Sequence, residues 1–134
     1  MAPVRQDSGD SAPKRRLLVV DDNRDAAESM SMLLQMWGHD VAFAYDGPSA
    51  LETAKQWQPE AVFLDIGLPG MDGYEVAERL RALPHAKGAI LIAITGYGQD
   101  GDRLRSQRAG IDHHLVKPVS PDALRSLIDS LQVH

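Results

Sequence analysis

The chain has 134 residues, no cysteine, 43% hydrophobic residues and a formal net charge of −5 at pH 7. This length predicts a single domain that folds without disulfides, and the lack of cysteine excludes thiolate metal sites. The apolar runs are far shorter than the ~20 residues that span a bilayer, and no signal peptide opens the chain, so we expect a soluble cytoplasmic protein without membrane insertion. The acidic balance disfavours direct binding to nucleic acid.

The N-terminal segment has the composition of a tail. Residues 1–15 contain Pro, Ser, Gly and scattered charges but almost no large apolar side chains. Such a segment cannot bury enough apolar surface to fold, so we predict a disordered tail followed by one domain over residues 16–134. The basic triplet Lys14-Arg15-Arg16 is interpreted as a solvated boundary before the first strand.

Apolar runs and helical patterns then alternate five times. Short continuous runs are typical of strands that are buried on both faces of a parallel sheet. They occupy residues 17–20, 41–44, 61–64, 89–94 and 114–116. The helical patterns between and after them occupy residues 26–37, 50–57, 76–80, 100–109 and 124–131.

Two of the helical patterns differ in quality. In the last, Ser120 is predicted as the N-cap and Pro121 as the first helical residue. In the fourth, only Leu104 and Ala109 are apolar, so we predict a marginal, mobile helix.

The alternation predicts an α/β fold, a doubly wound parallel sheet of five strands with helices on both faces. Ligands of such sheets bind at the carboxyl ends of the strands. The residues that follow each apolar run are therefore the candidates for a functional site.

Charged and polar side chains follow four of the five predicted strands. Asp21 and Asp22 follow the first and Asp65 the third, while Thr95 and Lys117 follow the fourth and fifth. Clustered carboxylates repel one another, and Mg²⁺, which prefers carboxylate oxygens, relieves that repulsion. One carboxylate can then attack phosphorus while the lysine and threonine bind phosphoryl oxygens.

Each of these residues has an ordinary structural explanation when taken alone. An Asp at a strand end commonly caps a helix, a Thr-Gly pair such as Thr95-Gly96 can end a strand, and Lys117 can be a surface lysine. Their occurrence at successive strand ends of one alternating pattern favours a shared site.

Four motifs carry a resemblance to a known family: LVVDDN at 18–23, LDIGLPGMDG at 64–73, ITG at 94–96 and LVKP at 115–118. Together they resemble the receiver domain of two-component response regulators, over about residues 16–131. The resemblance implies a flavodoxin-like (βα)5 fold with strand order 2-1-3-4-5. It also implies a signalling domain that takes a phosphoryl group from a sensor histidine kinase or a histidine phosphotransfer protein and switches its binding face, without turnover of a separate substrate.

The resemblance also implies a role for each matching residue around the metal. Asp65 is the phosphoacceptor. Asp22 ligates Mg²⁺ directly, Asp21 holds it largely through water, and the Asp65 carboxylate and the backbone carbonyl of Gly67 are further ligands.

The phosphoryl group is implied to lie in a cradle of donors. Lys117 and Thr95 bind its oxygens, and the backbone amides of Ile66 and Gly96 complete the cradle. We predict a cis Lys117–Pro118 bond that turns the ammonium toward Asp65.

Three positions depart from the commonest family pattern. Gly67 and Tyr97 lie two residues after Asp65 and Thr95, beside the water that hydrolyses the acyl phosphate in this family, so the lifetime of the phosphorylated form stays open. The switch position three residues before the lysine is His114, where Tyr or Phe is commoner. We predict that His114 and Thr95 switch an output face for a downstream protein, formed by the 100–109 helix, the fifth strand and the last helix.

Two other classes were weighed against this interpretation. A haloacid-dehalogenase-type phosphatase has a second Asp two residues after the nucleophile, where this chain has Gly67. A flavodoxin-like small-ligand binder needs a Ser-, Thr- or Gly-rich loop after the first strand, where this chain has Asp21-Asp22-Asn23.

The 17–37 and 119–124 segments resemble receivers at the C-termini of hybrid histidine kinases. No output domain is expected after Leu131, so we expect a stand-alone receiver or one excised from a longer protein.

Overall fold

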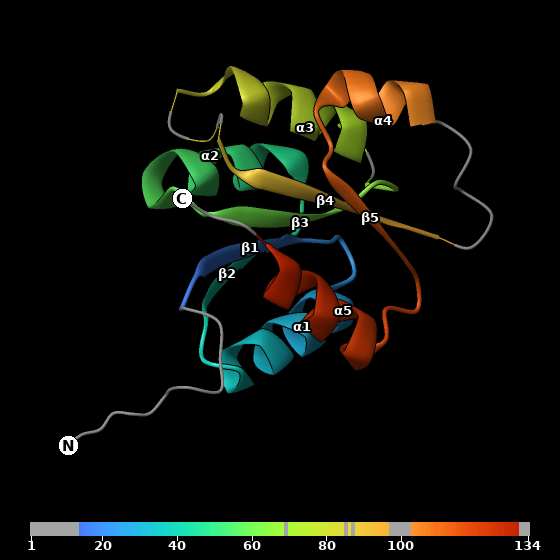
Figure 1. The fold of residues 1–134 in the computed structure, drawn as a ribbon. Coiled ribbons are helices and arrows are strands. Elements are labelled where there is room, and N and C mark those ends of the chain that lie inside the picture. The colour runs from blue at the N-terminus through green and yellow to red at the C-terminus, as the bar shows by residue number, and fades with distance from the viewer. Residues whose placement is uncertain (1–13, 69, 85, 87, 97–102, 132–134) are drawn as a thin grey trace.

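The computed structural model describes residues 14–131 except 69, 85, 87 and 97–102 (Figure 1). The strands are β1 (Arg16–Val20), β2 (Asp40–Ala44), β3 (Ala61–Asp65), β4 (Ile90–Thr95) and β5 (His113–Val116). The helices are α1 (Arg24–Met36), α2 (Gly47–Trp57), α3 (Gly73–Ala82), α4 (Arg103–Ala109) and α5 (Pro121–Ser130). Among the described residues, no helix has the length and apolar character that a bilayer crossing needs.

The strands form one parallel sheet in the order β2-β1-β3-β4-β5. Helices α1 and α5 cover one face, and α2, α3 and α4 cover the other (Figure 1). This arrangement confirms the predicted doubly wound fold and its strand order.

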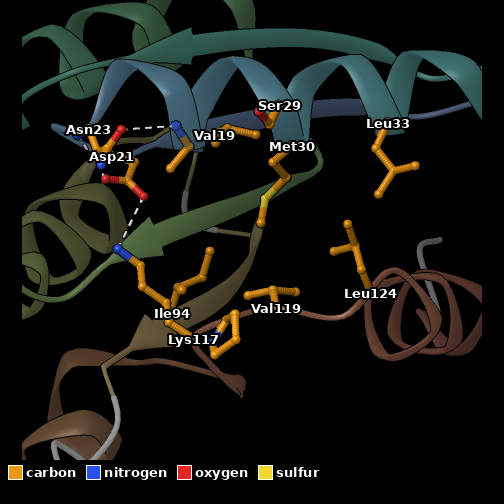
Figure 2. Close-up of a pocket in the computed structure, with 12 residues that line it drawn as sticks. Val19, Asp21, Asn23, Ser29, Met30, Leu33, Ile94, Lys117, Val119 and Leu124 are labelled. Carbon is orange, nitrogen blue, oxygen red and sulfur yellow. Dashed lines mark hydrogen bonds and ion pairs between the residues drawn. The ribbon is translucent and has the colours of Figure 1, made fainter.

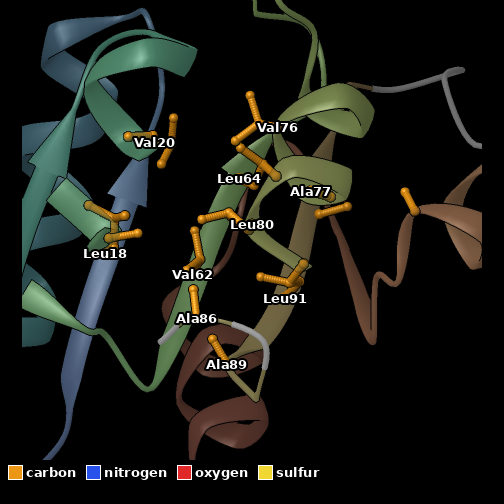
Figure 3. Close-up of a cluster of buried hydrophobic side chains, with 14 of the residues drawn as sticks. Leu18, Val20, Val62, Leu64, Val76, Ala77, Leu80, Ala86, Ala89 and Leu91 are labelled. Carbon is orange, nitrogen blue, oxygen red and sulfur yellow. The ribbon is translucent and has the colours of Figure 1, made fainter. Parts of the chain in front are cut away.

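Each face of the sheet carries its own hydrophobic core. Phe63 of the central strand β3 is fully buried on the side of α1 and α5. Val62 and Leu64 of the same strand are fully buried on the other side, against Leu80 of α3 (Figure 3). Because both faces of β3 are buried, the strand is apolar at successive positions rather than at alternate ones. Burying a side chain of this size contributes about 1.5–3 kcal/mol.

Side-chain caps set the helix starts. Ser120 Oγ accepts a hydrogen bond from the Ala123 amide at 3.0 Å, and Pro121 opens α5, as predicted. Asn23, Asp46 and Asp72 cap α1, α2 and α3 in the same way. These three helices begin two or three residues before their apolar patterns, because the first turns are held by caps and not by buried side chains.

The interpretation of Arg15 as part of a solvated boundary is wrong. Arg15 is buried, its backbone amide donates to His39 Nδ1 at 3.1 Å, and its guanidinium donates to the Leu131 carbonyl at 3.1 Å. The arginine therefore ties the start of β1 to the end of α5. Residues 1–13 of the predicted tail lie outside the described residues.

Helix α4 is the least apolar of the helices, as its sequence predicts. Ser106 and Ala109 are its buried residues among those described, and Leu104 is 57% exposed. The 100–102 part of the predicted helix lies outside the described residues.

Candidate functional site

Three carboxylates meet at the carboxyl edge of the sheet. Asp21 follows β1 and Asp65 ends β3, and these two strands are neighbours in the sheet. Carboxylate oxygens of Asp21, Asp22 and Asp65 all lie within 4.8 Å of one another. Asp21 and Asp65 are buried, whereas Asp22 is exposed. The topology thus brings together the acids that the sequence places at strand ends.

Lys117 joins two of the acids. Its Nζ lies 3.2 Å from Asp65 Oδ2 and 3.3 Å from Asp21 Oδ2. The Lys117–Pro118 bond is cis, as predicted. The lysine therefore offers its ammonium at the carboxylate that is predicted to receive the phosphoryl group.

The charges of the site act on one another. Burial raises the pKa of the Asp21 carboxyl, and the neighbouring charge of Asp65 adds to this, although the Asn23 amide and Lys117 act in the opposite direction. Burial by itself lowers the pKa of Lys117, but Asp65 and Asp21 outweigh it, so that the net pKa is raised. One ammonium against three carboxylates leaves an excess of negative charge.

These acids fit a hard divalent cation. The donors are carboxylate oxygens, which Mg²⁺ prefers, and the exposed Asp22 leaves room for the waters that Mg²⁺ keeps. A cation there would also offset the repulsion by Asp65, which adds to the effect of burial on the pKa of Asp21.

The backbone after Asp65 requires one correction. The Ile66 amide donates to the Ile94 carbonyl at 3.0 Å, which continues the pairing of β3 with β4. The Gly67 amide donates to Asp65 Oδ1 at 2.9 Å. The amide next to the Asp65 carboxylate is therefore that of Gly67, whereas the prediction gave the Ile66 amide this place in the cradle. The role of the Gly96 amide stays a prediction.

Thr95 of β4 contacts β5, and His114 of β5 contacts α4. Thr95 is buried, and its hydroxyl makes a long hydrogen bond of 3.5 Å to the Leu115 carbonyl. His114 is exposed, and its Nε2 lies 2.6 Å from Ser106 Oγ of α4. The two predicted switch residues thus form contacts that run from β4 through β5 to α4. Tyr97 lies outside the described residues.

A contact that the sequence patterns miss links α4 to the loop after Asp65. Arg105 of α4 forms an ion pair of 3.0 Å with Asp72, and its guanidinium lies 4.6 Å from the centre of the Tyr74 ring. Asp72 also caps α3, for which an Asp before a helical pattern is a signal. No local pattern marks Arg105, because its partner lies 33 residues away.

Comparisons with known proteins agree on one family. Residues 17–129 match the family model described as response regulator receiver domain. The transcriptional regulator RpaA of Synechocystis is 32% identical over 116 residues, which are 87% of this chain and 48% of that protein. The chain spans about half the length of most curated relatives that it matches, which include PrrA of Mycobacterium tuberculosis, where the match covers 46%.

Solved structures match over most of their length. A receiver domain protein from Methanospirillum hungatei superposes with a TM-score of 0.79 at 30% identity, covering 87% of this chain and 91% of that one. The receiver domain of the Pseudomonas aeruginosa sensor histidine kinase PA1611 superposes with a TM-score of 0.77 at 28% identity, covering 87% and 95%. The latter is described with a magnesium ion coordinated in its active site cleft.

Proposed function

Because the chain belongs to the response regulator receiver domain family, we propose that its Asp65 carboxylate accepts a phosphoryl group from a phosphohistidine of a sensor histidine kinase or a histidine phosphotransfer protein. The observation that carries this proposal is the position of Asp65, buried at the end of the central strand with Lys117 Nζ at 3.2 Å. The protein is a phosphoacceptor signalling domain, and its curated relatives include the transcriptional regulators RpaA and PrrA. We place it in the cytoplasm.

The transfer is a displacement at phosphorus. A carboxylate oxygen of Asp65 forms the new bond to phosphorus as the bond to the histidine nitrogen breaks, and the imidazole keeps the electron pair and is protonated. Lys117 stabilises negative charge on the phosphoryl oxygens, and the Gly67 and Gly96 amides and the Thr95 hydroxyl are further donors. The chain catalyses only its own phosphorylation and dephosphorylation.

Asp21, Asp22 and Asp65, with the Gly67 carbonyl, would hold Mg²⁺. When bound, the ion neutralises charge on the carboxylates and the incoming phosphoryl group. The magnesium ion of the Pseudomonas aeruginosa receiver domain supports this assignment.

The switch follows from the contacts of Thr95 and His114. A phosphoryl group on Asp65 competes with the Leu115 carbonyl for the Thr95 hydroxyl, which makes a long hydrogen bond of 3.5 Å to that carbonyl. Movement of Thr95 opens space that the His114 ring can enter, which breaks the contact between His114 and Ser106. Helix α4 is then released on one side, so the face formed by α4, β5 and α5 changes for a downstream protein.

Labelling with acetyl phosphate and Mg²⁺ tests the phosphoacceptor. We expect the native protein to gain one acid-stable, hydroxylamine-labile phosphoryl group, and Asp65→Asn to gain none. Asp129→Asn, which changes an exposed carboxylate at the far end of α5, is the matched control and should label like the native protein. Stoichiometric labelling of Asp65→Asn would refute the proposal.

A further inference from the structure

A cavity of about 580 Å³ lies between α1 and α5, over the sheet face that these helices cover (Figure 2). Val19 and Ile94 of the sheet form its floor, Met30 and Leu33 belong to α1, and Val119 and Leu124 lie at the start of α5. Small-molecule sites are typically of roughly 300–1,000 Å³ and mainly apolar. The cavity therefore has the size and lining of a small-molecule site.

Helices α1 and α5 pack against each other toward the C-terminal end of α1. Near the C-terminal end of α1, Arg125 of α5 lies over the Trp37 ring at 4.9 Å, and Leu34 and Ile128 are both fully buried in the same core. Near its N-terminal end, α1 contributes the small side chains of Ala26 and Ser29 to the lining, which leaves space between the two helices.

One end of the pocket adjoins the acidic site. Asp21 and Lys117 line this end and form an ion pair of 3.3 Å, and Asp22 and Asp65 lie in the cluster beside them. Figure 2 shows Asp21 and Lys117 paired at one end and Leu33 and Leu124 facing each other at the other. The excess of carboxylates over ammonium groups attracts a cation and repels an anion.

We propose that this pocket binds a small amphipathic amine, with its apolar body between Met30, Leu33 and Leu124 and its ammonium group at Asp21, where it competes with Lys117 for the carboxylate. An ammonium donates three hydrogen bonds, and apolar walls around the pair weaken the competition from water. Because the amine and Mg²⁺ both approach Asp21, each weakens binding of the other. The proposal does not depend on phosphorylation of Asp65.

The test uses protein labelled with ¹³C at the methionine methyl groups, without any phosphodonor. 4-Phenylbutylamine is titrated and compared with 4-phenylbutan-1-ol and 4-phenylbutanoate, which share its apolar body. We expect the Met30 methyl signal to shift saturably with the amine, with an affinity at least tenfold higher than for the carboxylate and threefold higher than for the alcohol. Met32 and Met36 on the same helix are 63% and 79% exposed and do not line the pocket, so their methyl signals should not shift.

Two matched variants test the location. Ser29→Phe places a ring in the pocket and should weaken amine binding at least tenfold. Ser126→Phe changes an exposed serine of α5 that does not line the pocket, so amine binding should be unchanged. Amide spectra of both variants establish that they fold.

Excess MgCl₂ should weaken amine binding at least threefold relative to NaCl of equal ionic strength. Equal affinity for the amine, the alcohol and the carboxylate would overturn the proposal, as would full amine binding by Ser29→Phe. If none of the three probes shifts the Met30 methyl signal, the cavity does not bind small molecules of this kind and the proposal is overturned.

Discussion

At the scale of single residues, the three acids of the site are not equivalent. Asp21 is buried and already paired with Lys117 at 3.3 Å, whereas Asp22 is exposed. A metal ion would have to compete with Lys117 for Asp21, whereas Asp22 has no ion pair among the described residues. This difference supports Asp22 as the direct ligand.

Asp22→Asn is expected to weaken Mg²⁺ binding about tenfold or more, which is about 1.4 kcal/mol. Asp21→Asn should weaken it less. Calorimetric titration of both variants with MgCl₂ measures the difference. Undiminished affinity in Asp22→Asn would contradict its assignment as a ligand.

His39 makes folding stability depend on pH. Burial lowers the pKa of His39 in the folded protein from its ordinary value of 6.5, and the neighbouring Arg15 adds to this. As pH falls, the unfolded chain binds the proton first, so the stability that neutral His39 contributes is present above about pH 6.5 and is lost progressively below it.

We therefore expect the urea midpoint of the native protein to fall between pH 7.5 and pH 5.5. In His39→Asn, which keeps an acceptor for the Arg15 amide but does not titrate, the fall should be smaller. The same pH dependence in both proteins would show that His39 is not responsible.

At the scale of elements, α3 packs directly on the end of β3. A Cβ at Gly73, the first residue of α3, would lie 2.6 Å from Ile66 Cα and 2.7 Å from the Asp65 carbonyl oxygen. These are backbone atoms, which cannot rotate away. Only glycine allows α3 to begin this close to β3.

Gly73→Ala should therefore lower the free energy of unfolding by about 1–3 kcal/mol, the usual cost of overpacking. Gly88→Ala is the matched control, because a Cβ there meets nothing within 4 Å. Urea denaturation of both variants measures the costs. Equal stability of the two would mean that α3 shifts without penalty.

Helix α4 is held by polar contacts from two directions. Arg105 pairs with Asp72 at the start of α3, and Ser106 contacts His114 of β5. With so few buried apolar side chains, α4 gains little of the hydrophobic stabilisation that holds the other helices. Its position therefore depends on contacts that end near Asp65 and Thr95, which suits an element that responds to the site.

At the scale of the whole molecule, the acidic site lowers the stability of the fold that builds it. Three carboxylates at one sheet edge repel one another in the folded protein and separate on unfolding. A cation that binds only the folded site reverses this effect.

A hundredfold excess of Mg²⁺ over its dissociation constant should raise the free energy of unfolding by about 2.7 kcal/mol. Urea denaturation in MgCl₂, compared with NaCl of equal ionic strength, measures the gain. Asp22→Asn should lose most of it. A gain that is the same in NaCl would indicate screening rather than a specific site.

Much of the architecture could be predicted from local pattern. Five apolar runs alternating with helical patterns predict the parallel sheet and its helices, and strand order followed from the receiver resemblance. Parallel strands end at one edge, so residues directly after β1 and β3 had to meet there, as Asp21 and Asp65 do. The hydrophobic pattern and the common direction of the strands suffice to predict these features, because both can be inferred from residues that are close together in the sequence.

Only the tertiary structure shows the features that depend on contacts between residues far apart in the sequence. Arg15 is buried, and His39 and Leu131, which accept hydrogen bonds from its backbone amide and its guanidinium, lie 24 and 116 residues away. The Gly67 amide, rather than that of Ile66, reaches Asp65 because pairing with β4 already uses the Ile66 amide. The pocket beside Asp21 depends on how far α1 and α5 separate. Periodicity predicts which face of a helix is buried, but spacing between two helices depends on the side chains that each presents to the other.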